Sequence, residues 1–104
     1  MSFLVLFASA ALLQTATENE ALARWQECVD ARTVKLTEDI GQTHYTPNRS
    51  RLVDAIARVA VAQCQHLWGW ELKSVDKERE QKAARKRAGV TAEALFRNYD
   101  LEAL

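Results

Sequence analysis

Two cysteines and two histidines are the residues of this sequence whose chemistry could define a site. Cys64 and His66 are two positions apart, so on a helix their side chains would diverge by about 200° and could not chelate one metal ion. His44 lies in a predicted turn. The sequence contains no Cys-x-x-Cys pair, phosphate-binding glycine loop or Gly-x-Ser-x-Gly motif. It therefore predicts no enzyme, no metal site, no cofactor and no small-molecule ligand.

The first element that must position a cysteine is a helix predicted over residues 18–40. At about 100° per residue, its apolar side chains cover an arc of roughly 120°, the width of a stripe that packs on one neighbour. Thr17 and Glu20 have the spacing of an N-terminal capping box. Gly41 is typical of the position just after a helix. The segment predicts a one-sided amphipathic helix with Cys28 on one flank of its apolar stripe.

The second element is a longer helix, predicted from Thr46 to Lys73. Thr46 suits the N-cap position, and Pro47 suits the first helical position. The apolar side chains of this helix cover roughly 220°, about twice the width that one neighbour needs. Cys64 lies near the centre of this arc. A helix with so wide an apolar arc needs two packing partners.

The positions of the two cysteines test the predicted hairpin. Cys28 lies 13 residues before Gly41, and Cys64 lies 17 residues after Pro47. At about 1.5 Å per residue, the two are roughly 20 Å and 25 Å from the turn. Cysteines at similar depths on apolar faces predict a disulfide in an oxidising compartment, and the alternative in a reducing compartment is two buried free thiols.

A charged stretch, residues 73–87, follows the second helix. Its strong helix formers and nearly absent apolar stripe predict a solvated extension of that helix. The alternative is contact with an anionic lipid or polymer surface. The residues that would make this contact are Lys82, Arg85, Lys86 and Arg87.

Gly89 is predicted to end this extension, and Thr91 to cap a short carboxyl-terminal helix. Leu95, Phe96 and Tyr99 share one face of that helix. Because so short a helix is marginally stable alone, we expect it to dock on a flank of the central helix.

The amino terminus contains an uncharged apolar run of 11 residues, Phe3 to Leu13. This run is too short to span a bilayer and has the length of the apolar region of a signal peptide. We expect cleavage after Ala16, which makes residues 1–16 a signal peptide and residues 17–104 a single small helical domain. The alternatives are an uncleaved anchor and a buried or frayed amino-terminal helix of a cytosolic protein.

The formal net charge of the 104 residues is zero, which argues against a general nucleic-acid or membrane-surface binder. The charges are nevertheless unevenly distributed. Residues 17–47 carry three basic and six acidic groups, and residues 48–104 carry 11 basic and 8 acidic groups. The two halves of the hairpin should therefore attract each other weakly, in a salt-dependent way.

One or both flanks of the wide apolar arc are predicted to remain uncovered. One flank consists of Leu52, Val59 and Trp70, and the other of Val61, Trp68 and Leu72. The carboxyl-terminal segment is too small to cover both. An exposed apolar flank that carries a tryptophan is typical of a contact surface. We therefore predict that Trp70 lies at the edge of a partner-binding or self-association site and that Trp68 lies in the core.

The pattern Trp25-x-x-Cys28-Val29, followed by a helix that starts at Ser50 and carries Ala55 and Cys64, resembles small uncharacterised exported proteins of proteobacteria. Those proteins are built as disulfide-linked helical hairpins, and the likeness covers residues 20–70. The resemblance implies a location in the bacterial envelope and no known activity.

The predicted fold is all-α: a disulfide-linked antiparallel helical hairpin with a long charged second helix and a short carboxyl-terminal helix. The predicted function is that of an exported, non-enzymatic interaction or structural protein of the bacterial envelope, periplasmic or secreted. Its predicted partner is a protein or a second copy of the chain, and neither a nucleic acid nor a small molecule. The alternative function is a cytosolic small helical adaptor that dimerises through its second helix.

Overall fold

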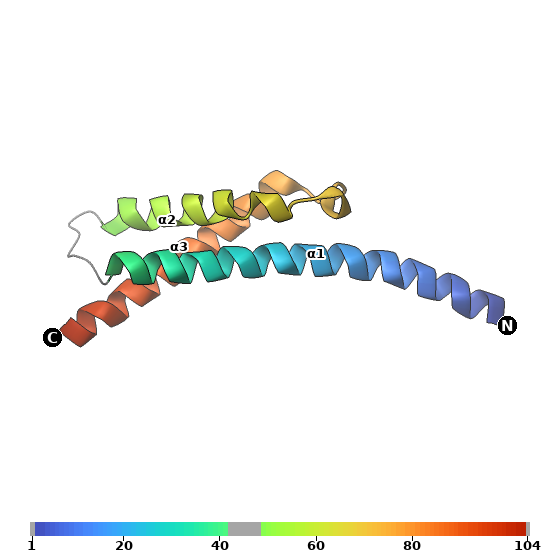
Figure 1. The fold of residues 1–104 in the computed structure, drawn as a ribbon, viewed down its shortest axis with the longest axis horizontal. Helices are drawn as coiled ribbons and strands as arrows, with labels where there is room; N and C mark the ends of the chain where they lie inside the picture. Colours follow the sequence, from blue (N-terminus) through green and yellow to red (C-terminus); the bar gives the residue numbers. More distant parts are fainter. Residues whose placement is uncertain (1, 42–48, 104) are drawn as a thin grey trace.

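The computed structural model describes residues 2–41 and 49–103, with side chains for residues 17–40 and 49–98. Over these ranges the chain forms three packed α-helices, α1 (Ser2–Gly41), α2 (Arg49–Gln63) and α3 (Lys77–Ala103). Two single-turn 3₁₀ helices, η1 (Gln65–Leu67) and η2 (Trp70–Leu72), connect α2 to α3. The molecule measures 67 × 24 × 17 Å because the amino-terminal part of α1 extends beyond the other elements (Figure 1). In the described ranges, no helix has the length and apolar character needed to cross a membrane.

The helices α1 and α2 form the predicted antiparallel hairpin (Figure 1). A disulfide joins Cys28 in α1 to Cys64, the residue that follows α2, with 6.0 Å between their Cα atoms. This confirms the predicted pairing. The predicted cap at Thr46, Pro47 and the turn residue His44 lie outside the described residues.

The second helix is shorter than predicted, because α2 ends at Gln63 rather than near Lys73. The chain then makes a series of i→i+3 turns, such as Leu67 N to Cys64 O at 3.1 Å. Gly69 adopts an extended conformation with φ −105° and ψ −167°. Leaving the helix here costs little free energy, because only proline has a lower helix propensity than glycine. The break reverses the chain, so that the following residues return to the hairpin instead of continuing into solvent.

The predicted charged extension and short carboxyl-terminal helix are in fact one helix, α3. Its start is marked by Asp76, whose Oδ1 accepts a hydrogen bond from the backbone N–H of Arg79 at 3.2 Å. Acidic residues in the first turn, Glu78 and Glu80, also suit the positive end of the helix dipole. Gly89 does not end the helix, and no glycine in the described ranges has a positive φ.

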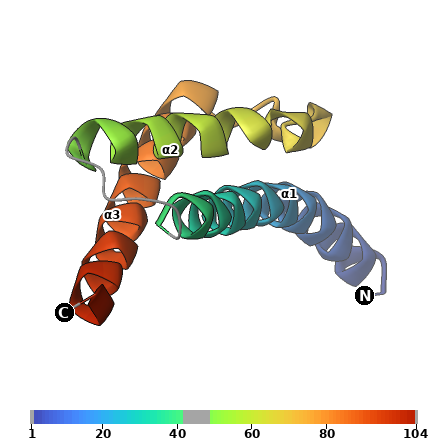
Figure 2. The same cartoon turned by 60° about the vertical axis from the view of Figure 1, so that its left-hand side comes forward.

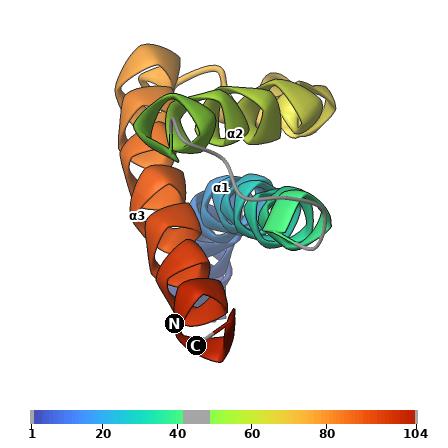
Figure 3. The same cartoon turned by 90° about the vertical axis from the view of Figure 1, so that its left-hand side faces the viewer.

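The α3 helix crosses both members of the hairpin on one side, as Figures 2 and 3 show. Its buried side chains, Ala84, Ala88, Ala92 and Phe96, recur at every fourth position. The buried residues of α1 follow the same spacing: Ala21, Trp25, Val29, Thr33 and Thr37. Ridges of fourth residues on two helices interdigitate when the helices cross at about 50°. The charged stretch was thus wrongly predicted to extend α2, because most of it belongs to α3 and its Ala84 is buried in the core.

The core consists of two clusters. The first contains Trp25, Val29, Ala57, Ala60, Val61, Cys64, Ala84 and Ala88. The second contains Ile56, Ala92 and Phe96, with Leu36, Ile40, Leu52 and Val53 packed around them. Each cluster draws residues from α2 and α3, so the wide apolar arc of α2 has the two partners it requires. Phe96 lies against α2 as expected, and the side chain of Tyr99 is outside the described residues.

Two features of α1 differ from the sequence-based expectation. The helix passes through Thr17 without interruption, so Thr17 does not mark the start of α1. Thr33 and Thr37 are fully buried although both are polar. Their hydroxyl groups donate to the carbonyls of Val29 and Thr33 respectively, each at 2.7 Å. Bonding within the helix satisfies the hydroxyl groups and allows threonine in the core.

Candidate functional site

The connection between α2 and α3, residues 64–76, presents the most exposed large apolar side chain among those described. Trp70 is 76% exposed, compared with 66% for Val90 and 43% for Val59. An exposed tryptophan is unusual, because this side chain is highly buried on average. Tryptophan also contributes strongly to the binding energy of protein interfaces. The connection is therefore the first candidate for a contact site.

Three anchors fix the connection to α1. The disulfide holds its first residue, Cys64, to Cys28. The indole of Trp68 meets that of Trp25 edge to face, with 5.0 Å between ring centroids and an interplanar angle of 85°, a favoured geometry for aromatic pairs. Leu72 is fully buried. Trp70 lies between the last two anchors, so it is presented on a segment held on both sides.

The anchoring tryptophan is also in contact with α3. The ammonium group of Lys77 lies 5.9 Å from the centroid of the Trp68 ring, within the range of a cation–π interaction. The indole Nε1 of Trp25 is buried and has no hydrogen-bond partner among the described residues. The base of the connection is thus a tryptophan pair that packs on the core cluster formed by all three helices.

The predicted partner-binding residues do not form one helix flank, because α2 ends before Trp70. Leu52 is half-buried and packs on the second core cluster. Val59 is exposed on α2. Trp68 is half-buried at the edge of the core rather than fully inside it. Among Leu52, Val59 and Trp70, the side chain of Trp70 has the largest exposed fraction.

The predicted anionic-surface residues divide into two groups. The guanidinium Nε of Arg87 donates to Asp30 Oδ1 at 3.1 Å, which links α3 to α1. Lys82, Arg85 and Lys86 are exposed and form no ion pair within the described part of the chain. Arg87 therefore makes an intramolecular contact, and the other three cations remain available.

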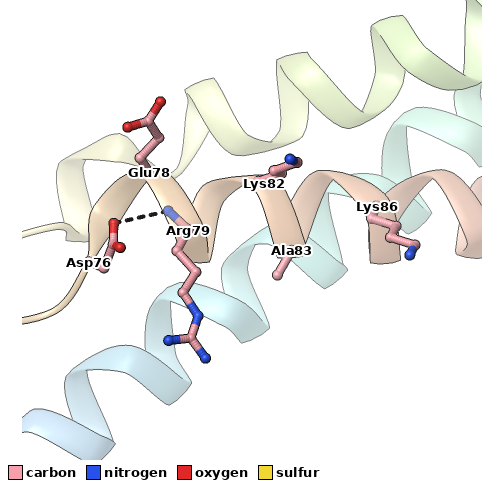
Figure 4. A pocket seen from close by; sticks show the side chains of 6 residues that line it. All are labelled: Asp76, Glu78, Arg79, Lys82, Ala83 and Lys86. Carbon is pink, nitrogen blue, oxygen red and sulfur yellow. Dashed lines mark hydrogen bonds between the residues drawn. The ribbon is translucent and has the colours of Figure 1, made fainter.

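A shallow surface depression of about 550 Å³ lies beside these cations (Figure 4). It is lined by Asp76, Glu78, Arg79, Lys82, Ala83 and Lys86. Arg79 was not among the predicted contact residues, although it lies three positions before Lys82 and so on the same side of a helix. All the lining residues are exposed, so the depression is open to solvent.

The charges around the depression are not arranged as a small-anion site. Asp76 caps α3 through its bond to the Arg79 backbone N–H. The carboxylate of Glu78 and the guanidinium of Arg79 extend in opposite directions (Figure 4). Lys82 and Lys86 also extend separately along the helix (Figure 4). The cations thus form a line on the outer surface of α3 rather than converging on one point.

The described residues provide no cluster of three or more His, Cys, Asp or Glu side chains able to hold a metal ion. The sulfur of Cys64 is bonded to Cys28, so it cannot serve as a thiolate ligand beside His66. The Nδ1 atom of exposed His66 lies 3.0 Å from the carbonyl oxygen of Gln63. This histidine is adequately explained by a local contact at the end of α2.

Comparison of the chain with protein-family models, with curated proteins and with solved structures finds no match. The resemblance to exported hairpin proteins therefore stays a prediction, and function must be inferred from the surface of this chain.

Proposed function

We propose that the protein is an exported, non-enzymatic helical interaction protein of the bacterial envelope and that a partner protein contacts Trp70. The observation that carries this proposal is the 76% exposure of Trp70 on a segment whose neighbours Trp68 and Leu72 are anchored. Tryptophan is enriched among the residues that dominate binding energy at protein interfaces. A preorganised segment also loses little conformational entropy on binding.

The disulfide supports the proposed location. Cys28 and Cys64 are bonded and no free cysteine remains in the described ranges. Structural disulfides persist in oxidising compartments such as the periplasm and are rare in the cytosol. A periplasmic or secreted location accords with this bond and with the apolar run Phe3 to Leu13.

The alternative of a cytosolic adaptor that dimerises through its second helix has less support. The buried residues of α2, Ile56, Ala57, Ala60 and Val61, pack within the monomer against α1 and α3. Among the described residues of α2, Val59 is the one large apolar side chain that is exposed. This leaves α2 with little apolar surface for a second copy.

The mass of the protein isolated from its own host tests the location. Removal of residues 1–16, combined with a mass two hydrogens lower than that of the dithiol form, is the expected result. A full-length reduced protein would contradict the proposed export.

Binding of a partner is tested by chemical crosslinking in the host envelope followed by purification of the tagged protein. The Trp70→Ala variant should lose its crosslinked complexes. The matched control is Val90→Ala, which removes another exposed apolar side chain from a different surface and should retain them. Equal recovery of complexes with both variants would contradict a contact at Trp70.

A further inference from the structure

The outer face of α3 carries a line of unpaired cations. Arg79, Lys82, Lys86 and Val90 are separated by three, four and four positions, a spacing that places them on one face of a helix. All four are exposed. This face is turned away from the buried alanine ridge that packs on the hairpin. We define these four residues as the α3 outer strip.

Two other basic residues of α3 have an acidic partner, unlike the cations of the strip. Arg87 bonds to Asp30 at 3.1 Å, and Arg97 lies 3.6 Å from Glu93. Lys77 is placed over the Trp68 ring. Within the described ranges, no ion pair involves Arg79, Lys82 or Lys86. The strip therefore presents three positive charges that have no ion-pair partner among the described residues.

We propose that the α3 outer strip docks on the anionic headgroups of a lipid bilayer. A line of cations on a convex helix fits a flat, extended anionic surface and encloses no single anion. Val90, which is 66% exposed, continues the same line. An apolar side chain gains free energy at the boundary between headgroups and acyl chains, where amphipathic helices with a basic face bind. A nucleic acid would offer the side chain of Val90 no such apolar environment.

This contact is separate from the proposed partner site, because it uses α3 and not Trp70. The two proposals can fail independently. If both hold, the lipid surface positions the protein while the connection stays available to a partner.

The test is sedimentation of the purified disulfide-bonded protein with lipid vesicles. Vesicles of phosphatidylglycerol mixed with phosphatidylcholine should bind the protein, and vesicles of phosphatidylcholine alone should bind it much more weakly. Salt should weaken the binding, because screening shortens the range of charge attraction to about 8 Å at physiological ionic strength. Each basic residue near an anionic surface contributes roughly a fivefold increase in binding.

The variant Arg79→Gln/Lys82→Gln/Lys86→Gln should therefore bind phosphatidylglycerol vesicles roughly a hundredfold more weakly. The matched control is Arg24→Gln/Arg32→Gln/Arg51→Gln, which removes the same charge from exposed cations that form no ion pair within the described residues. The control should keep most of the binding. Val90→Ser should weaken it less than the triple strip variant.

Three results would overturn the proposal. One is the absence of binding of the parent protein to phosphatidylglycerol vesicles at low salt. Another is an equal loss of binding in the strip variant and the matched control, which would indicate an effect of net charge alone. The third is binding to inorganic polyphosphate without binding to vesicles, which would identify a soluble polyanion as the ligand.

Discussion

At the scale of single residues, the sequence predicted the pairing of the two cysteines but not the burial of two threonines. Cys28 and Cys64 could be paired from their distances to the turn, because a helix has a fixed rise per residue. Thr33 and Thr37 could not be placed in the core by residue type, since a hydroxyl group counts as polar. Their spacing of four residues, which continues the series Trp25 and Val29, was the pattern that could have indicated their burial. A threonine that bonds to its own helix presents its methyl group to the core.

The two tryptophans of the connection should respond differently to truncation. Trp68→Ala removes a half-buried ring from its contact with Trp25 and should lower the free energy of unfolding by about 2–3 kcal/mol. Trp70→Ala removes a ring that lies mostly in water and should change it by less than about 0.5 kcal/mol. Thermal or urea unfolding followed by circular dichroism measures both. A loss at Trp70 as large as that at Trp68 would show that Trp70 packs against the protein.

At the level of elements, the hairpin was predicted and the boundary between α2 and α3 was not. The apolar periodicity continued through residues 64–73 at helical spacing, which favoured one long helix. Two local signals indicated the break. Gly69 disfavours a helix, and Asp76 followed by Glu78 and Glu80 is typical of a helix start.

The alanine ridge of α3 was missed for a different reason. Ala84, Ala88 and Ala92 have little apolar surface each, and they alternate with many charges. Small side chains nevertheless permit close approach of two helices, and their spacing of four residues matches the ridge on α1. The charges led to the prediction of a solvated segment, whereas the alanines make the contact with the hairpin.

Substitution of Gly89 tests the continuity of α3. A Cβ atom at this position would meet Val53 Cγ1 at 3.6 Å, an ordinary van der Waals distance. Gly89→Ala should therefore stabilise the protein by about 0.5–1 kcal/mol, because alanine favours a helix interior. The melting temperature should rise by a few degrees.

The control for this experiment is Gly69→Ala. Gly69 lies outside a helix interior, and its Cβ would be 3.1 Å from the flexible Glu71 carboxylate, so no comparable gain is expected. If Gly89 instead ended a helix in a left-handed conformation, Gly89→Ala would destabilise the protein.

At the level of the whole molecule, α1, α2, α3 and the Cys28–Cys64 disulfide enclose a small core. Ion pairs between helices contribute little, because the side chains of Arg87 and Asp30 are 43% and 52% exposed. Arg49 and Glu93 are 3.8 Å apart and also partly exposed. The crossing of α3 over the hairpin could not be predicted from the sequence, because it depends on where the connection reverses the direction of the chain. Burial of the apolar core and the disulfide therefore contribute more to the tertiary stability than these ion pairs do.

Reduction of the disulfide should lower the melting temperature by well over 10 °C. The bond joins residues separated by 36 positions, and closing a loop of this size stabilises a protein by about 3–4 kcal/mol in the chain-entropy model. Each kilocalorie corresponds to roughly 4–8 °C for a domain of this length. Cys28→Ser and Cys64→Ser should cost similar amounts, since both remove the same bond. Equal melting temperatures with and without reductant would contradict a structural role for the disulfide.

The contact of a partner with Trp70 is tested most directly by placing a photoreactive amino acid at that position. Benzoylphenylalanine would replace Trp70 in one variant and Val90 in the other, both exposed positions, and each variant would be irradiated in its host. We expect a discrete protein crosslink from position 70 and none of the same mass from position 90. Added parent protein should compete this product away, and Trp70→Ala protein should not. Absence of a product at position 70, or the same product at both positions, would contradict the proposed function.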